Sequence, residues 1–312
     1  MKFGLLSGIL WGLDTCILGI AFLYQPFNSA LDAALVCAAV HDIISALVLI
    51  TLVVARGKFS QFLQALRTKG ALIICCGALM SGPVGMNAYM SSINNIGSAP
   101  TAIISAFYPA VGTFLAVFFL KESMNTQRLV ALFVALAGVI MVGLQTAQGS
   151  VEGNTIIGVA AAFICVLAWG SGAVFASWGL QSTQDLDCDV ALLIHELTSS
   201  LTYALIVLPL VGAWGFVAQM SVAPASIFVI GAGVAGALSY LFYYKAIDVT
   251  GAARAMACNI SYCAWALIFS SLYAATMPNL MSIICCIAIF VGTILSATPD
   301  WSVFLPQTDK HM

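Results

Sequence analysis

The chain has 312 residues, of which 62% are hydrophobic and only 7% charged, and its formal net charge is −2. A soluble domain carries about 25% charged residues, so this composition excludes a water-soluble globular surface. We expect the protein to lie in the lipid bilayer and to bind no nucleic acid.

The apolar residues form ten evenly spread runs of roughly 20 residues, the length that crosses the hydrocarbon core of a bilayer. We expect the first run to be a retained helix rather than a cleaved signal peptide, because Asp14 lies in its middle and no convincing Ala-x-Ala site follows it. We therefore predict an all-α membrane protein with ten transmembrane helices. Their expected ranges are 3–24, 31–55, 70–94, 98–120, 126–146, 154–178, 189–213, 224–246, 250–275 and 278–298.

The ten Lys and Arg residues set the orientation of these helices. With ten spans, all of them fall on the side of both termini, and the opposite loops contain none. Cytoplasmic loops are the ones enriched in Lys and Arg. We expect a multi-pass protein of a bacterial inner (cytoplasmic) membrane with both termini, including a tail over 300–312, in the cytoplasm.

The sequence also repeats itself. At an offset of 154 residues His41 meets His195 and Asp42 meets Glu196, and at a slightly different offset Trp11 meets Trp169. We predict two five-helix halves, 1–147 and 153–299. Because five is odd, the second half enters from the opposite side, and such inverted repeats place the substrate near the midplane. An alternating-access transporter needs this symmetry, whereas an enzyme or a scaffold does not.

Three acids lie deep inside predicted spans: Asp14, Asp42 and Glu196. A charge at the bilayer centre costs about 2.5–3.5 kcal/mol on insertion scales. The only deep bases are His41 and His195, so the interior is negative and favours a cationic substrate, a coupled proton, or both. Alternatively, the acids are protonated or hydrogen-bonded and hold helices together. The two histidines are either proton relays or partners that orient neighbouring helices.

Aromatic residues accompany these acids. Trp11 and Trp169 are mid-span, and Tyr240, Tyr243 and Tyr244 form a stripe at helical spacing. Such a stripe is either ordinary packing or part of a cation–π cage for a quaternary ammonium group. A polar tail of the ligand could meet Asn87. The predicted substrate-binding residues are Trp11, Asp14, Asp42, Met86, Asn87, Tyr89, Trp169, Glu196, Tyr240 and Tyr243.

Glycine and proline mark two further features. Gly4, Gly8 and Gly12 recur every fourth residue on the first helix, as either a homodimer face or a site of close packing inside a monomer. Gly82-Pro83 should kink the third helix and free backbone carbonyls beside a cavity.

Catalytic and cofactor chemistry has no sequence support. Nine of the ten cysteines lie in apolar runs without zinc-ligand spacing, and no HExxH, GxSxG or Walker A motif occurs. We expect no catalytic residue, no metal and no cofactor, which leaves an intramembrane enzyme or a scaffold as remote alternatives.

The stretch from Tyr108-Pro109 to Lys121-Glu122, followed by Gly138-Val139-Ile140, resembles the helix four–five signature of EamA-type members of the drug/metabolite transporter superfamily. Four short motifs resemble the LicB-type bacterial choline transporters within it. They are Trp11-Gly12, His41-Asp42-Ile43, Gly82-Pro83-Val84-Gly85-Met86 and Ala168-Trp169-Gly170-Ser171. The resemblance implies a secondary transporter of choline or a related quaternary amine, and it does not extend to Asp14 or His195-Glu196. The alternative is a proton-coupled exporter of amino acids or other small metabolites.

Overall fold

The computed structural model describes residues 1–28, 30, 32–96, 101, 104–105, 107–146, 154–298 and 301. Every long regular element in these ranges is a helix, and no strand occurs within them. The predicted junction of the two halves, at 147–153, lies outside the described residues. So does the predicted tail over 300–312, apart from Trp301.

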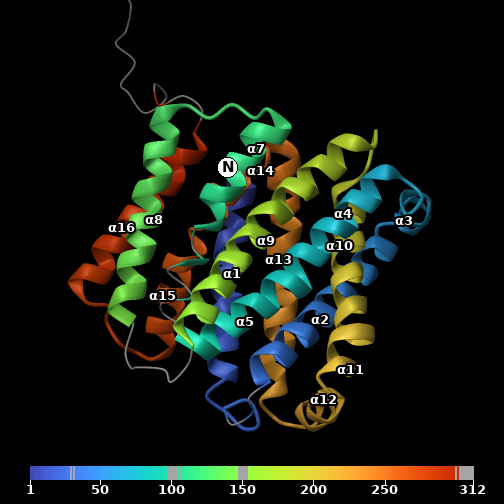
Figure 1. Cartoon of the computed structure of the whole chain (residues 1–312), viewed down its shortest axis with the longest axis horizontal. Coiled ribbons are helices and arrows are strands. Elements are labelled where there is room, and N and C mark those ends of the chain that lie inside the picture. Colours follow the sequence, from blue (N-terminus) through green and yellow to red (C-terminus); the bar gives the residue numbers. More distant parts are fainter. Residues whose placement is uncertain are drawn as a thin grey trace, which may run out of the picture.

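Helices of different lengths run through the whole molecule (Figure 1), as the apolar runs predicted. In the first part of the chain they are α1 (Lys2–Ala21), α2 (Ala33–Ala55), α3 (Phe59–Ala65), α4 (Lys69–Leu79), α5 (Gly85–Ile96), α7 (Tyr108–Leu120) and α8 (Thr126–Thr146). In the second they are α9 (Thr155–Ser182), α10 (Cys188–Thr202), α11 (Leu208–Leu210), α12 (Trp214–Ser221), α13 (Ser226–Thr250), α14 (Ala252–Asn259), α15 (Tyr262–Tyr273) and α16 (Leu280–Ala297).

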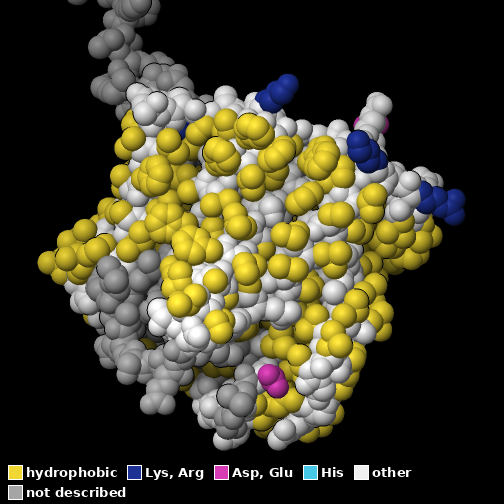
Figure 2. Space-filling model, in the orientation of Figure 1, with side chains coloured by type: hydrophobic (Ala, Val, Ile, Leu, Met, Phe, Trp, Pro, Cys, Tyr) yellow, Lys and Arg dark blue, Asp and Glu magenta, His cyan; other side chains and the backbone are white. Residues whose placement is uncertain are grey.

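Eight helical segments of the described chain are long and apolar enough to cross a membrane. Two further apolar helices, Tyr108–Leu120 and Thr126–Met141, are shorter. Each of the ten segments overlaps its predicted range, and five of them extend past it by one to four residues. The number of helices that span the bilayer stays a prediction. Hydrophobic side chains cover most of the surface in Figure 2. Phe118, for example, is 69% exposed, which suits contact with lipid tails.

The helix contacts come in matched pairs. Helix α1 packs on α13 and α15, while α9 packs on α4–α5 and α7. Helix α2 packs on α13 as α10 packs on α4, and α8 pairs with α16. Exchanging α1 for α9, α2 for α10 and α4–α5 for α13 therefore maps one set of contacts onto the other. The short helices α3 and α12 follow the same rule, because α3 contacts α10 and α12 contacts α2, and they lie at opposite ends of the bundle (Figure 1).

The third predicted helix is broken where Gly82-Pro83 occurs. A π-helical turn, Met80–Val84, joins α4 to α5 and contains Pro83. Proline has no backbone N–H and clashes with the preceding turn, and π turns of this kind are frequent at functional sites. The expected kink is thus a local widening of the helix in the middle of the molecule.

Ion pairs tie the loop before α3 to the start of α10. The Arg56 Nη1 and Lys58 Nζ atoms each lie 2.6 Å from Oδ2 of Asp189, and Lys58 Nζ also lies 2.6 Å from Oδ2 of Asp187. Burial opposes the charge on Lys58, but its hydrogen bonds to the two aspartates raise the pKa of the ammonium group, so Lys58 stays charged at neutral pH. These contacts fasten the two predicted halves together at one end.

The glycine series on α1 packs inside the molecule. A Cβ at Gly4 would meet Cys258, one at Gly8 would meet Ser261, and one at Gly12 would lie 2.5 Å from the Cβ of Trp265. These partners belong to α14, α15 and the turn between them. Of the two interpretations given above, close packing within the bundle is correct for this face, and a dimer interface there is wrong.

Candidate functional site

A cavity of about 120 Å³ opens at the centre of the bundle. This volume far exceeds the roughly 10–15 Å³ that a single water needs on the same measure. The predicted third helix (α4–α5) lines it together with α1, α2, α9, α10 and α13, as expected, and α7, α14 and α15 add Tyr108, Asn259 and Tyr262. The cavity is large enough for a small molecule and is shared by both predicted halves.

Most of the predicted site residues line this cavity, but four do not. Those that line it are Trp11, Asp42, Met86, Trp169, His195, Glu196, Tyr240 and Tyr243. Tyr89 lies against Trp169, which lines the cavity, and Asp14 lies against His41. His41 is itself buried behind Asp42. Asn87 is not among the described residues that line the cavity, although its neighbour Met86 is.

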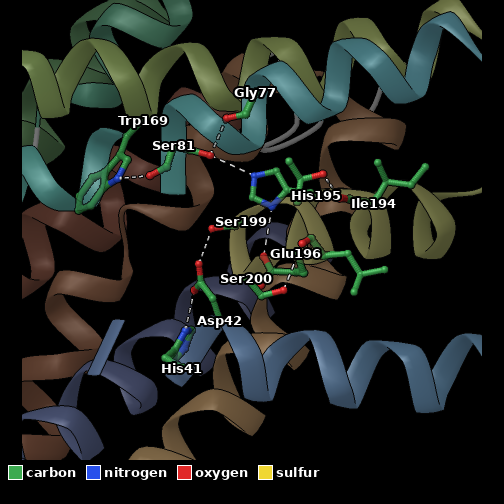
Figure 3. Close-up of polar contacts among 12 residues, drawn as sticks. His41, Asp42, Gly77, Ser81, Trp169, Ile194, His195, Glu196, Ser199 and Ser200 are labelled. Carbon is green, nitrogen blue, oxygen red and sulfur yellow. Dashed lines mark hydrogen bonds and ion pairs between the residues drawn. The ribbon is translucent and has the colours of Figure 1, made fainter. Parts of the chain in front are cut away.

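The first polar cluster joins α1, α2 and α10. The His41 ring lies between two acids, with Nε2 3.3 Å from Oδ1 of Asp14 and Nδ1 3.2 Å from Oδ1 of Asp42. Ser199 donates a hydrogen bond of 2.6 Å to the other oxygen of Asp42 (Figure 3). Sequence neighbours His41 and Asp42 thus do touch, although their positions on a helix did not require it.

The second cluster repeats this arrangement with different outer partners. Nδ1 of His195 lies 3.2 Å from Oε1 of Glu196, and Nε2 lies 3.0 Å from Oγ of Ser81. Ser81 donates its own hydroxyl proton to the carbonyl of Gly77. His195 and Ser199 are one turn apart on α10, so this single helix face carries both clusters (Figure 3).

The two clusters together hold more acidic than basic groups. The first brings His41 beside Asp14 and Asp42, and the second brings His195 beside Glu196. An imidazole carries one positive charge when both ring nitrogens are protonated. With the three carboxyl groups ionised and both imidazoles protonated, the charges of the two clusters would sum to −1.

Aromatic rings border the cavity on both sides. The Trp11 ring centroid lies 4.9 Å from that of Tyr240, and the Trp169 centroid lies 5.1 Å from Tyr89 and 6.1 Å from Tyr108. Tyr240, Tyr243 and Tyr244 all line the cavity. The tyrosine stripe on α13 therefore borders the open space.

The broken third helix positions Trp169. The indole Nε1–H of Trp169 donates to the carbonyl of Ser81 at 3.0 Å, within the π-helical turn (Figure 3). A Cβ at Gly85 would lie 2.7 Å from Cδ1 of Trp169, so the glycine gives the ring room. Ser81 thus supplies the carbonyl and Gly85 the space for this tryptophan.

Comparisons with known proteins agree with this arrangement. Residues 2–144 match the family described as the EamA-like transporter family. The chain is 27% identical over 267 residues to Protein LicB of Haemophilus influenzae (strain ATCC 51907 / DSM 11121 / KW20 / Rd). The matched region covers 85% of this chain and 86% of LicB. The residues that match the family lie within the first predicted half, which therefore resembles an EamA-like transporter domain. A solved crystal structure with a TM-score of 0.70 covers 95% of each chain at 16% identity, which shows a shared fold.

The cavity also has lining residues that the sequence interpretation did not select. Tyr108 donates to Oδ1 of Asn259 at 2.9 Å, and Nδ2 of Asn259 donates to Oγ of Ser7 at 2.9 Å. The Ser7 and Ser239 hydroxyls lie 3.1 Å apart. Polar residues inside an apolar span are a signal of function, and Asn259 could have been found on that ground. The cavity therefore has a polar side formed by Tyr108, Ser239 and Asn259, with Ser7 of α1 behind them.

Proposed function

We propose that this protein is an EamA-type secondary transporter of a small organic cation, choline or a related quaternary amine. The observation that carries the proposal is the excess of acids in the two histidine–acid clusters, three carboxyl groups against two imidazoles, beside an aromatic-lined cavity. No Lys or Arg is among the described residues that line this cavity. An ammonium group without N–H bonds binds well against aromatic faces, which Trp11, Trp169 and Tyr240 supply.

Alternating access between two inverted five-helix halves is the proposed mechanism. The matched helix contacts of α1 with α13 and of α9 with α4–α5 support two equivalent halves. The visible Lys and Arg side chains gather along one edge of the molecule (Figure 2), which supports the orientation with cytoplasmic termini in a bacterial inner membrane. The functional unit is a monomer or a homodimer.

The membrane potential favours import of such a cation. Each positive charge gains about 2.3 kcal/mol per 100 mV of inside-negative potential, which corresponds to about 50-fold accumulation without a coupled ion. Export would need a counter-ion such as a proton. His41 and His195 are the candidate proton carriers, because each shares protons with a neighbouring acid.

A proton-coupled exporter of amino acids or other metabolites is the second candidate. A zwitterion carries a carboxylate, which needs a cationic or N–H-rich partner in the cavity. The lining acids Asp42 and Glu196 would repel that carboxylate, and this disfavours the second candidate. An enzyme or a scaffold is more remote, since nothing in the cluster geometry requires catalysis.

Isothermal titration calorimetry on the purified protein tests the proposal. Choline should bind to wild type, and Trp11→Ala and Trp169→Ala should each weaken binding, since a cation–π contact contributes about 0.5–2 kcal/mol. Asp42→Asn should weaken it further by removing the negative charge. Binding of neutral or anionic metabolites, without binding of choline or betaine, would overturn the cation proposal and leave the membrane transport role standing.

A further inference from the structure

Two buried polar atoms in the cavity wall have no hydrogen-bond partner among the described residues: Oε2 of Glu196 and the hydroxyl of Tyr244. Glu196 is 1% exposed and Tyr244 2% exposed, and both line the cavity. Other acid oxygens nearby are engaged, because Asp42 uses one oxygen for His41 and the other for Ser199. Buried polar groups are normally paired, so these two atoms point to a ligand that pairs with them.

The two atoms lie beside the same imidazole ring. Glu196 contacts His195 through its other oxygen, Oε1, and the Tyr244 ring centroid is 5.8 Å from that of His195. The Tyr240 centroid is 6.4 Å from that of His195 and 4.9 Å from that of Trp11. A short molecule with its cation at Trp11 and Tyr240 can therefore extend toward Glu196 and Tyr244.

The chemistry of the pair selects one group. A carboxylate oxygen only accepts hydrogen bonds, whereas a phenol hydroxyl can donate one. A ligand hydroxyl satisfies both atoms at once, since it donates to Glu196 and accepts from Tyr244. A quaternary ammonium can do neither, and a ligand carboxylate would face the carboxylate of Glu196.

We propose that Glu196 and Tyr244 form a hydroxyl-binding subsite, so that this transporter selects cationic amino alcohols over simple alkylammonium ions. The proposal rests on the cation-transport function proposed above and adds the group that determines specificity. It assigns the ligand tail to α10 and α13, and not to Asn87 on α5.

Calorimetric binding of four ligands to the full-length protein tests the subsite. The ligands are choline, ethyltrimethylammonium (no oxygen), O-methylcholine (an acceptor without a donor) and betaine (a carboxylate). Wild type should bind choline about tenfold more tightly than ethyltrimethylammonium, as expected for a hydrogen bond to a charged partner. O-methylcholine should bind more weakly than choline, and betaine most weakly.

Tyr244→Phe removes the donor and keeps the ring. We expect it to weaken choline binding and to bring the choline-to-ethyltrimethylammonium ratio down by several-fold, while the affinity for ethyltrimethylammonium changes little. Tyr273→Phe, at an exposed tyrosine of α15, is the matched control and should keep the wild-type ratio.

The outcomes separate the two proposals. Equal binding of choline and ethyltrimethylammonium to wild type would overturn the subsite and leave cation transport standing. An unchanged ratio in Tyr244→Phe would also overturn the assignment to Tyr244. Absence of binding by all three quaternary cations would overturn the proposed function itself. The wild-type ligand series remains decisive if the Tyr244→Phe protein does not fold.

Discussion

The two deep tryptophans have equivalent places in the repeat but different partners. Trp169 donates its indole N–H to the carbonyl of Ser81, while Trp11 packs its ring against Tyr240 and His41. One therefore fixes the broken third helix against α9, and the other mainly borders the cavity. Both tryptophans line the cavity, but only Trp169 has a hydrogen bond to the broken helix.

This difference predicts unequal effects of the same substitution. Trp169→Phe removes the indole donor and leaves the Ser81 carbonyl unpaired, which should destabilise the protein by about 1–3 kcal/mol. Trp11→Phe removes the same atoms without breaking a hydrogen bond to that turn, so it is the control. Thermal unfolding of both variants in detergent should give the lower melting temperature for Trp169→Phe, and equal melting temperatures would contradict this reading.

At the scale of elements, close approach of helices explains the small residues of α1. Gly12 lets α1 reach α15 so closely that an added Cβ would lie 2.5 Å from the Cβ of Trp265 and 2.9 Å from the backbone nitrogen of Ala266. Backbone atoms cannot move aside as a flexible side chain can. The α1–α15 contact therefore depends on the absence of a side chain at this position.

Gly12→Ala should accordingly force the two helices apart. Overpacking of this kind costs about 1–3 kcal/mol, which should appear as a lower melting temperature of the purified protein. Gly19→Ala on the same helix is the matched control, since nothing lies within 4 Å of a Cβ built there. If both alanine variants melt at the same temperature, the packing argument for α1 is incorrect.

At the scale of the whole molecule, the visible Lys and Arg side chains lie toward one end (Figure 2). The ion pairs of Arg56 and Lys58 with Asp187 and Asp189 lie at the end of the bundle that carries α3. At the opposite end α12 packs through apolar contacts, such as the T-shaped pair of Phe216 with Phe27. Equivalent connections of the two predicted halves are thus held by charge at one end and by apolar packing at the other.

This sorting predicts the orientation in the membrane. Lys and Arg are retained on the cytoplasmic side, so the end with α3 and both chain termini should be cytoplasmic. Fusion of alkaline phosphatase to the C-terminus should be inactive, and fusion of a fluorescent protein that matures only in the cytoplasm should fluoresce. Phosphatase activity at the C-terminus would overturn both the orientation and the count of ten spans.

The sequence by itself determined the helical class, the approximate position of each apolar helix and the residues that merit attention. Apolar runs of spanning length can only be satisfied by helices or closed barrels in lipid, and deep charges are expensive enough to mark a site. Trp11, Asp42, Trp169 and Glu196 were selected on these grounds, and all four line the central cavity.

The tertiary structure alone decided which of the selected residues face the cavity. Helical spacing says which residues share a face, but lipid-facing and bundle-facing surfaces are both apolar in a membrane protein, so hydropathy does not show which face turns inward. For that reason Asn87 and Tyr89 were placed in the site and Tyr108 and Asn259 were not. The contact of Asp14 with His41 joins two different helices and depends on packing that no local sequence pattern records. The same holds for the lack of hydrogen-bond partners at Glu196 Oε2 and the Tyr244 hydroxyl.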